Sequence, residues 1–498
     1  MSGGGERPEE LSWTGHRQSA ARPYRSDIDG LRAVAVLAVV AFHVKFSAFP
    51  GGYIGVDVFF VISGYLIGSI ILEEVAAGGF SLLAFYERRV RRIFPALAVL
   101  LLLLSVPAYL YLLPNELTAY GGSVLAATFS VSNFYFLLHT GYFAAPAYHL
   151  PLLHTWSLAI EEQFYIFLPL FILLLHRLAP RLLPLLLLAA TVLSFLLCLR
   201  ETAVDQAAAF YLPWTRAWEL LLGTLIALGL FAQPRTPLWR NIAALAGLAL
   251  ILGPAAAYNA ATVFPGANAL APCLGAALII AAGRAGDSWV ARLLSWRPLV
   301  FIGRISYSLY LWHWPVIVFM IMSGLTPSTH QPSWLKFLAV VSSVILATLS
   351  WRYVETPFRT GPRRPSRRKL FTLAGAAAAA LALLGLTGTL SQGLPGRFPA
   401  HSAALAGYLD YDWASKGYFR RGSCFLDTGL AFQPFLASGC IREDAKRPSD
   451  LILGDSHAAH LWYGLSRVFP GINFLQATSP SASPSWRSRH GPRRSAAG

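Results

Sequence analysis

Charged residues are scarce in this chain of 498 residues. They make up 13% of the sequence, whereas soluble globular proteins carry about 25%. Hydrophobic residues make up 55%. This composition excludes an ordinary soluble protein and predicts an integral membrane protein. Acidic residues are fewer than basic residues. The 24 Asp and Glu against 40 Lys and Arg give a formal net charge of +16.

The basic surplus does not indicate nucleic-acid binding. Basic residues lie in short loops between apolar runs, as in RTGPRRPSRRK at 359–369, and not on a face with interleaved aromatic residues. Short basic loops are typical of the cytoplasmic side of membrane proteins. Besides the N-terminal arm, they lie at 88–92, 177–181, 235–240, 284–297 and 359–369.

The long apolar runs predict an all-α polytopic membrane protein. Twelve runs have helical length: 29–46, 54–72, 93–113, 120–138, 156–175, 182–199, 208–230, 241–257, 267–283, 300–322, 334–354 and 370–390. The basic loops share one side only if 120–138, which contains Gly121, Ser130 and Asn133, is re-entrant or interfacial. The sequence therefore predicts ten spans and an eleventh linking span, with a cytoplasmic N-terminus and an external C-terminus.

The character of the chain changes near residue 391. The run LILGDSHAAHLW has a short apolar strand pattern, then a turn, then a helical pattern, as in an α/β domain. We expect a disordered cytoplasmic arm at 1–25, a membrane domain at 26–357, a basic cytoplasmic linker at 358–369, a linking helix at 370–390, an external segment at 391–478 and a disordered tail at 479–498.

Cysteine is also scarce, with four residues and no CxxC pair, so no metal site is predicted. Cys198 and Cys273 fall in apolar runs and are expected to be small buried residues. Cys424 and Cys440 flank a short loop in the predicted external segment. An oxidising compartment favours a disulfide between these two.

The run at 29–46 contains an arginine and a histidine eleven positions apart, Arg32 and His43. In a helix this spacing returns to within about 20° of one face and separates the two by about 16 Å. Charged groups inside a membrane usually mark a functional path. Two plainer interpretations stay open, in which Arg32 extends to the interface and His43 is a neutral, hydrogen-bonded core residue.

Two further stretches carry polar groups at helical spacing. HTWSLAIEEQFY at 154–165 places His154, Ser157 and Glu161 on one helix face. FYERRVRRIFP at 85–95 contains four arginines, which alone indicate a topology anchor as readily as a binding site.

Several long motifs resemble the acyltransferase-3 family of bacterial membrane proteins. They are DGLRAVAVLAVVAFHV, GGYIGVDVFFVISGYLI, RRVRRIFPAL, HTWSLAIEEQFY, FIGRISYSLYLWHWP and WRYVETPFR, in the family's order within about 24–357. The resemblance implies a bacterial inner-membrane enzyme. It would transfer an acyl group, usually acetyl, from cytoplasmic acyl-CoA to a hydroxyl of a periplasmic or cell-surface glycan such as O-antigen or lipopolysaccharide. The family's Arg-x10-His pattern corresponds to Arg32 and His43, and its arginine motif to Arg89 and Arg92.

The residue types suit this reaction. Arginine forks bind phosphate oxygens, so Arg89 and Arg92 are expected to hold acyl-CoA, a co-substrate rather than a bound cofactor, with Arg32 further along its path. His43 would act as the base on the acceptor hydroxyl or carry the acyl group itself. Glu161 or Glu162 would orient the imidazole or the sugar.

Aromatic residues are the acceptor-site candidates, together with His154. Trp156, Tyr165 and Tyr310 can stack on sugars, although interfacial anchoring is the more common role of such residues.

Two other classes of function remain open. One is a transporter of the glycan or the acyl donor, which an inverted repeat would favour, and none is found. The other is a scaffold whose active site has decayed.

The external segment resembles the SGNH hydrolase-like domain that is often fused to this family. GDSHAAH at 454–460 matches its first block, with Ser456 as the candidate nucleophile. Such a serine needs an activating histidine, which the family carries downstream in an Asp-x-x-His block. No such block follows Ser456, and the Ser/Pro/Arg-rich tail has no apolar periodicity. We therefore expect an incomplete and inactive α/β segment.

Overall fold

The computed structural model describes residues 24–139, 149–231, 233–325, 333–361, 364–407, 417–420, 423–426 and 438–479. Nearly all of the predicted N-terminal arm and C-terminal tail lies outside these residues. The described chain forms two compact units, considered separately below. The first comprises residues 1–112, 116–137 and 147–391, and the second comprises 113–115, 138–146 and 392–498.

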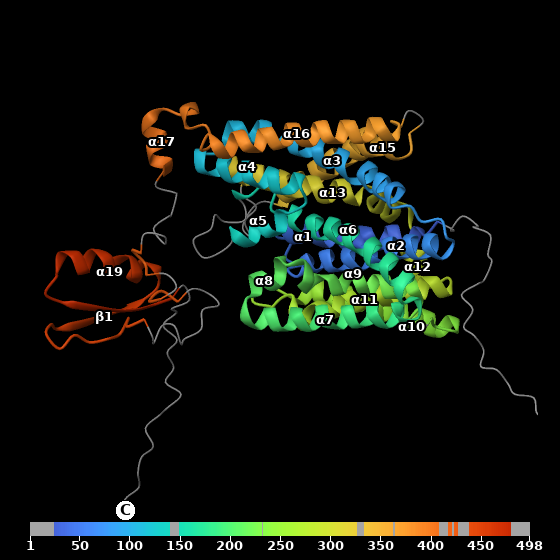
Figure 1. The fold of residues 1–498 in the computed structure, drawn as a ribbon, viewed down its shortest axis with the longest axis horizontal. Helices are drawn as coiled ribbons and strands as arrows, with labels where there is room; N and C mark the ends of the chain where they lie inside the picture. The colour runs from blue at the N-terminus through green and yellow to red at the C-terminus, as the bar shows by residue number, and fades with distance from the viewer. Residues whose placement is uncertain are drawn as a thin grey trace, which may run out of the picture. The chain divides into compact units, whose positions relative to one another are not determined.

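The first unit is helical, and its long helices lie side by side with roughly parallel axes (Figure 1). In chain order they are α1 (Ser26–His43), α2 (Gly55–Ala76), α3 (Leu82–Tyr111), α4 (Pro114–Thr128), α5 (Ser132–Leu138), α6 (Thr155–Leu178), α7 (Leu183–Val204), α8 (Gln206–Tyr211), α9 (Pro213–Leu228), α10 (Pro237–Ala257), α11 (Leu270–Ala285), α12 (Trp289–Leu294), α13 (Arg297–Met322), α14 (Ser333–Ser350), α15 (Thr356–Arg359) and α16 (Arg367–Leu390). A π-helical turn, Trp351–Glu355, joins α14 to α15.

Nine helical runs of the described residues are long and apolar enough to cross a membrane, which confirms the predicted fold class. They contain α2, α3, α6, α7, α10, α11, α13, α14 with α15, and α16. Two further predicted spans correspond to α1 and α9. The first carries three charged residues within 18 positions, and the second has 16 residues, about 24 Å of helix. Both pack among the long helices, α1 against α13 and α2, and α9 against α2 and α7.

Two of the predicted apolar runs do not form a single helix. Residues 120–138 form the end of α4 and the separate short helix α5, and neither helix reaches the roughly 30 Å of a hydrocarbon core, which agrees with the prediction that this run is not a span. The prediction of one helix over 208–230 is wrong, because α8 ends at Tyr211 and α9 begins at Pro213. Proline disfavours helical backbone in the residue before it, and Leu212 is extended, with ψ of 136°.

The interface between α2 and α9 requires glycine. A Cβ atom added at Gly64 would overlap the backbone of Leu220, and one added at Gly223 would overlap the backbone of Val61. The two backbones approach closely enough for the Thr224 hydroxyl to donate a hydrogen bond to the Gly64 carbonyl at 3.2 Å. Small residues allow this close approach between membrane helices.

A buried ion-pair network crosses the same interface. Arg216 of α9 lies 2.9 Å from an Asp57 carboxylate oxygen of α2 and 2.9 Å from a Glu219 oxygen on its own helix. All three side chains are buried. Four aromatic rings surround the guanidinium within 6 Å, those of Phe60, Trp156, Phe210 and Phe264. The network therefore fixes how α9 lies against α2.

The second unit contains a β-α-β arrangement, of which the sequence predicts the first strand and the helix. Strand β1 (Ser449–Gly454) pairs in parallel with β2 (Asn473–Thr478), and α19 (Ser456–Val468) connects them. At the turn Gly454 has φ of 155°, and a Cβ there would crowd the side chain of Ala458. A shorter helix, α17 (Ala400–Gly407), precedes this arrangement in the chain. Cys424 and Cys440 form the predicted disulfide.

The predicted sidedness is testable by cysteine labelling. A single cysteine replacing Arg235 should react with an impermeant thiol reagent only from the cytoplasm, and one replacing Glu201 only from outside, because basic loops are retained inside. Arg89 and Arg363, of which Arg363 lies outside the described residues, are expected on the cytoplasmic side. Reaction of both positions from one side, or a cytoplasmic Cys424, would contradict the span count.

The ion-pair network predicts an unequal response to loss of charge. Replacing Arg216 by Met should lower the free energy of unfolding by about 3–5 kcal/mol, because two buried carboxyl groups lose their partner. The matched control is Arg235→Met, since Arg235 is exposed. Thermal unfolding in detergent, followed by size-exclusion chromatography, gives the comparison. Equal midpoints for the two variants would show that the network does not stabilise the fold.

Candidate active site

Helix α1 carries both residues of the Arg-x10-His pattern, and they face different cavities. Arg32 lines a cavity toward the N-terminal end of the helix, and its guanidinium lies 3.4 Å from Asp29. His43, the last residue of α1, lines a second cavity. We call these the arginine cavity and the histidine cavity. Helix α1 therefore places the Arg32 guanidinium in the wall of the arginine cavity and the His43 imidazole in the wall of the histidine cavity.

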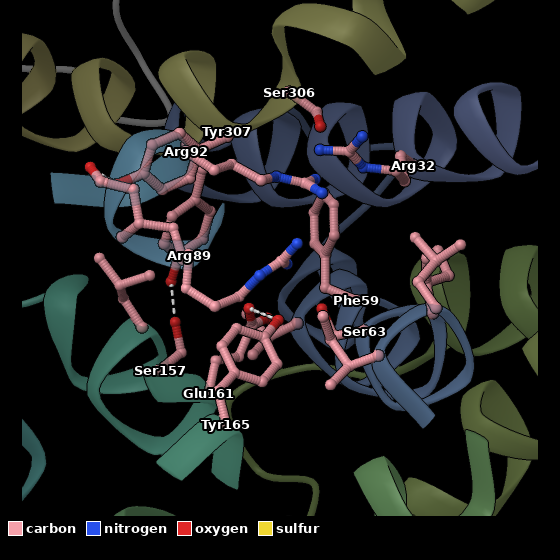
Figure 2. Close-up of a pocket in the computed structure, with 17 residues that line it drawn as sticks. Arg32, Phe59, Ser63, Arg89, Arg92, Ser157, Glu161, Tyr165, Ser306 and Tyr307 are labelled. Carbon is pink, nitrogen blue, oxygen red and sulfur yellow. Dashed lines mark hydrogen bonds between the residues drawn. The ribbon is translucent and has the colours of Figure 1, made fainter. Parts of the chain in front are cut away.

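The arginine cavity is narrow, with a volume of about 80 Å³. Arg89 and Arg92 of α3 and Arg32 of α1 extend their guanidinium groups toward it (Figure 2). Its other polar lining residues are Ser63, Ser157, Glu161, Tyr165, Ser306, Tyr307 and Tyr310. Three guanidinium groups face one carboxyl group among these lining residues, so the space suits an anionic or strongly polar ligand.

The structure separates the two candidate glutamates. Glu161 lines the arginine cavity and accepts a hydrogen bond from the Tyr165 hydroxyl at 2.9 Å. Glu162 is not among the residues that line this cavity, and its Oε1 is buried without a hydrogen-bond partner among the described residues. Neither glutamate lines the histidine cavity.

The four arginines of α3 divide into two pairs. Arg88 binds Glu74 at 2.8 Å, and Arg91 binds Glu87 at 2.7 Å. Arg89 and Arg92 instead line the arginine cavity, and the buried Nε of Arg89 has no hydrogen-bond partner among the described residues.

A basic opening adjoins the arginine cavity. We call it the basic mouth, and its lining residues are Ala84, Glu87, Arg88, Arg89, Arg91, Arg92, Arg359 and Arg364. Arg89 and Arg92 line both spaces. These two side chains therefore stand where the mouth meets the cavity.

The histidine cavity is wider, with a volume of about 430 Å³, and largely aromatic. Its aromatic lining residues are Phe42, Tyr53, Trp156, Phe210, Tyr211, Phe264, Tyr310 and Trp314. His154 also lines it and is 4% exposed, and neither ring nitrogen has a hydrogen-bond partner among the described residues. Buried polar groups normally have partners, so a polar ligand would fit beside His154. The acceptor-site candidates His154, Trp156 and Tyr310 thus meet in one cavity, whereas Tyr165 lines only the arginine cavity.

His43 contacts a second histidine that the sequence analysis did not select. His43 Nδ1 lies 3.1 Å from Nε2 of His313, which is fully buried on α13. The His313 Nδ1 in turn lies 2.7 Å from the Tyr310 carbonyl oxygen and 3.1 Å from that of Leu309. The WHWP tetrapeptide at 312–315 was visible in the sequence, but nothing in it indicates contact with a residue 270 positions earlier.

Tyr310 and Val56 line both the arginine cavity and the histidine cavity. The Tyr310 hydroxyl donates a hydrogen bond to the His154 carbonyl at 2.9 Å and lies 2.5 Å from the Ser157 hydroxyl. Tyr310 therefore stands at the boundary between the two cavities, in contact with α6. The three spaces form a series from the basic mouth to His43.

Asp57, Glu219 and Cys273 bring possible metal ligands within 4.8 Å of one another. Arg216 argues against a metal site there, because its guanidinium lies 2.9 Å from both carboxylates and would repel a cation. We interpret the cluster as the ion-pair network described above.

Comparison with known proteins identifies the family. A family model described as "Acyltransferase domain" matches residues 25–352. The chain belongs to the acyltransferase-3 family. This assignment confirms the resemblance inferred from the motifs.

Two curated relatives have names that describe an activity. "Peptidoglycan O-acetyltransferase OatA" of Listeria monocytogenes is 34% identical over 353 residues, which cover 68% of this chain and 56% of the relative. "O-acetyltransferase OatA" of Staphylococcus aureus is also 34% identical, over 68% of this chain and 57% of the relative. The chain thus spans a little over half the length of these relatives. No solved structure matches it.

The family match does not extend to the second unit, so the SGNH resemblance stays a prediction. The structure places Ser456 as the first residue of α19, directly after the strand-to-helix turn. Asp455 caps this helix by accepting a hydrogen bond from the His457 backbone N–H at 2.9 Å. The local geometry is that of a strand, a turn and a helix start at which Ser456 is half-buried.

Proposed function

We propose that this protein is a membrane O-acyltransferase that moves an acyl group, most simply acetyl, from acyl-CoA to a hydroxyl of a cell-envelope glycan. The observation that carries the proposal is the series of three adjoining spaces. Arg89 and Arg92 are shared between the basic mouth and the arginine cavity, and Tyr310 is shared between the arginine cavity and the histidine cavity. One extended ligand could therefore reach from the basic mouth toward His43.

The donor assignment rests on charge and shape. Acyl-CoA carries phosphates at one end and a thioester at the end of a slender pantetheine arm. Arginine forks at the basic mouth suit the phosphates, and the narrow arginine cavity suits the arm. We place the thioester near Tyr310, because that side chain faces both cavities.

The acceptor assignment rests on the histidine cavity. Aromatic walls suit the faces of sugar rings, and the unpartnered nitrogens of His154 suit hydroxyl groups. Both curated relatives are named as O-acetyltransferases, and the Listeria protein as one that acts on peptidoglycan. These names favour a peptidoglycan-type acceptor over the O-antigen or lipopolysaccharide expected from the motifs.

In the proposed reaction the acceptor oxygen attacks the thioester carbonyl while His43 takes the hydroxyl proton. The carbon–sulfur bond then breaks, and the CoA thiolate takes the proton back from His43. In the alternative course His43 attacks the thioester carbonyl first, the carbon–sulfur bond breaks, and the CoA thiolate leaves. The acceptor hydroxyl then takes the acyl group from the His43 ring, and its proton passes to the thiolate. Both courses require an unprotonated ring nitrogen on His43.

The donor site predicts different effects for cavity-lining and exposed arginines. Replacing Arg89 and Arg92 by alanine should raise the KM for acyl-CoA by about tenfold or more. Arg177→Ala, the matched control, should change it little, because Arg177 is exposed and lines neither the basic mouth nor the arginine cavity. Lysine at both positions should rescue only partly, since it lacks the bidentate fork. Acyl-CoA consumption in isolated membranes measures the effect. Full rescue by lysine would favour the topology-anchor interpretation.

The reaction centre predicts a comparison between two residues. His43→Ala should lower acyl transfer by about 10²- to 10⁴-fold, the usual effect of losing a general base. Ser456→Ala should change it little if the chemistry occurs in the histidine cavity. Both variants are measured in one membrane assay, with correct insertion checked by detergent extraction. An inactive serine variant beside an active histidine variant would overturn the proposal.

A further inference from the structure

The hydrogen-bond partners of His313 determine which of its ring nitrogens carries the hydrogen. Its Nδ1 faces two backbone carbonyl oxygens, those of Tyr310 at 2.7 Å and Leu309 at 3.1 Å. Carbonyl oxygens only accept hydrogen bonds, so a hydrogen on Nδ1 satisfies this contact, whereas a lone pair there would face two other lone pairs. Nδ1 of His313 is therefore the protonated nitrogen.

The same reasoning extends to His43. A neutral imidazole carries one hydrogen, so Nε2 of His313 holds a lone pair. A doubly protonated His313 is disfavoured, because the residue is fully buried and a charged ring would lose its hydration. The His313 Nε2 lies 3.1 Å from His43 Nδ1. To make this hydrogen bond, His43 must donate from Nδ1, which leaves its Nε2 unprotonated.

We propose that His313 is a positioning residue that holds His43 in the Nδ1–H tautomer. The His43 Nε2 then has the lone pair that takes the acceptor proton or the acyl group. A hydrogen-bond chain runs from the α13 backbone carbonyls through His313 to His43, so the rigid helix sets both the tautomer and the ring orientation. This inference rests on the proposed role of His43.

The surroundings favour control by the protein rather than by water. The His43 ring packs against Trp314 with a centroid distance of 4.7 Å and against His313 at 5.1 Å. The Trp314 indole N–H donates a hydrogen bond to the Leu150 carbonyl at 2.9 Å, which fixes that side chain. The wrong tautomer of a catalytic histidine lowers the rate of serine proteases on the order of 10⁴-fold. A residue that selects the His43 tautomer can therefore have a large effect on the rate of acyl transfer.

The test compares His313→Leu with His313→Gln, using acetyl-CoA as the donor in membranes that contain the full chain. Leucine removes the acceptor for His43 Nδ1–H, so kcat should fall by about 10²-fold or more, with KM for acetyl-CoA unchanged. Glutamine offers an amide oxygen near the position of Nε2 and should recover at least tenfold of that loss. His176→Leu is the matched control, because His176 is exposed at the far end of α6.

A spectroscopic measurement tests the tautomer without relying on activity. In protein labelled with ¹⁵N-histidine, the His43 ring nitrogens should show a protonated Nδ1 and an unprotonated Nε2 in the native chain. The population should shift toward Nε2–H in His313→Leu. An Nε2–H tautomer in the native chain would overturn the inference even if both variants failed to fold.

The outcomes separate this inference from the proposed function. If His43→Ala is inactive while His313→Leu keeps full kcat, the role of His43 stands and the tautomer inference is wrong. The tautomer inference is also wrong if glutamine is no better than leucine while both variants are folded. If His43→Ala remains active, the proposed base or carrier role fails first, and the spectrum alone decides the tautomer.

Discussion

The contact between α2 and α9 is the constraint on which the histidine cavity depends. Gly64 and Gly223 let the two helices approach closely, and the ion pairs of Arg216 with Asp57 and Glu219 fix their relative position. Desolvating these charges is costly, and only their mutual pairing offsets that cost. Asp57 and Arg216 also line the histidine cavity, so the network that holds the helices forms part of its wall.

Buried charges therefore serve two purposes in this protein. In the ion-pair network each carboxylate lies within 3 Å of the arginine, and the arrangement is structural. The arginine cavity is lined by three guanidinium groups and one carboxyl group, that of Glu161, which accepts a hydrogen bond from Tyr165. An imbalance of this kind inside a membrane is costly unless a ligand completes it. The phosphates of acyl-CoA, the proposed donor, would complete it.

Helix α1 contributes one residue to each of the two cavities. Arg32 and His43 lie on α1, so the distance between the proposed donor-binding group and the proposed proton acceptor is set by the rise of a continuous helix. Helix α13 supplies both Tyr310 at the boundary between the cavities and His313 beside the His43 ring. Because α1 packs along α13, the geometry at both points depends on a single helix–helix contact.

The amino-acid sequence by itself determined what depends on local pattern. Apolar run length predicts the spans, helical spacing places Arg32 and His43 on one helix, and the short apolar run before Gly454 predicts the strand and helix of the second unit. Local pattern failed at 208–230, where Pro213 divides the predicted span. Only the tertiary structure brought His313 to His43, paired Arg216 with Asp57, and put Glu161 in the arginine cavity with Arg89 and Arg92. These contacts join segments up to 270 positions apart, and they depend on which helices pack together, a property that periodicity within one segment does not encode.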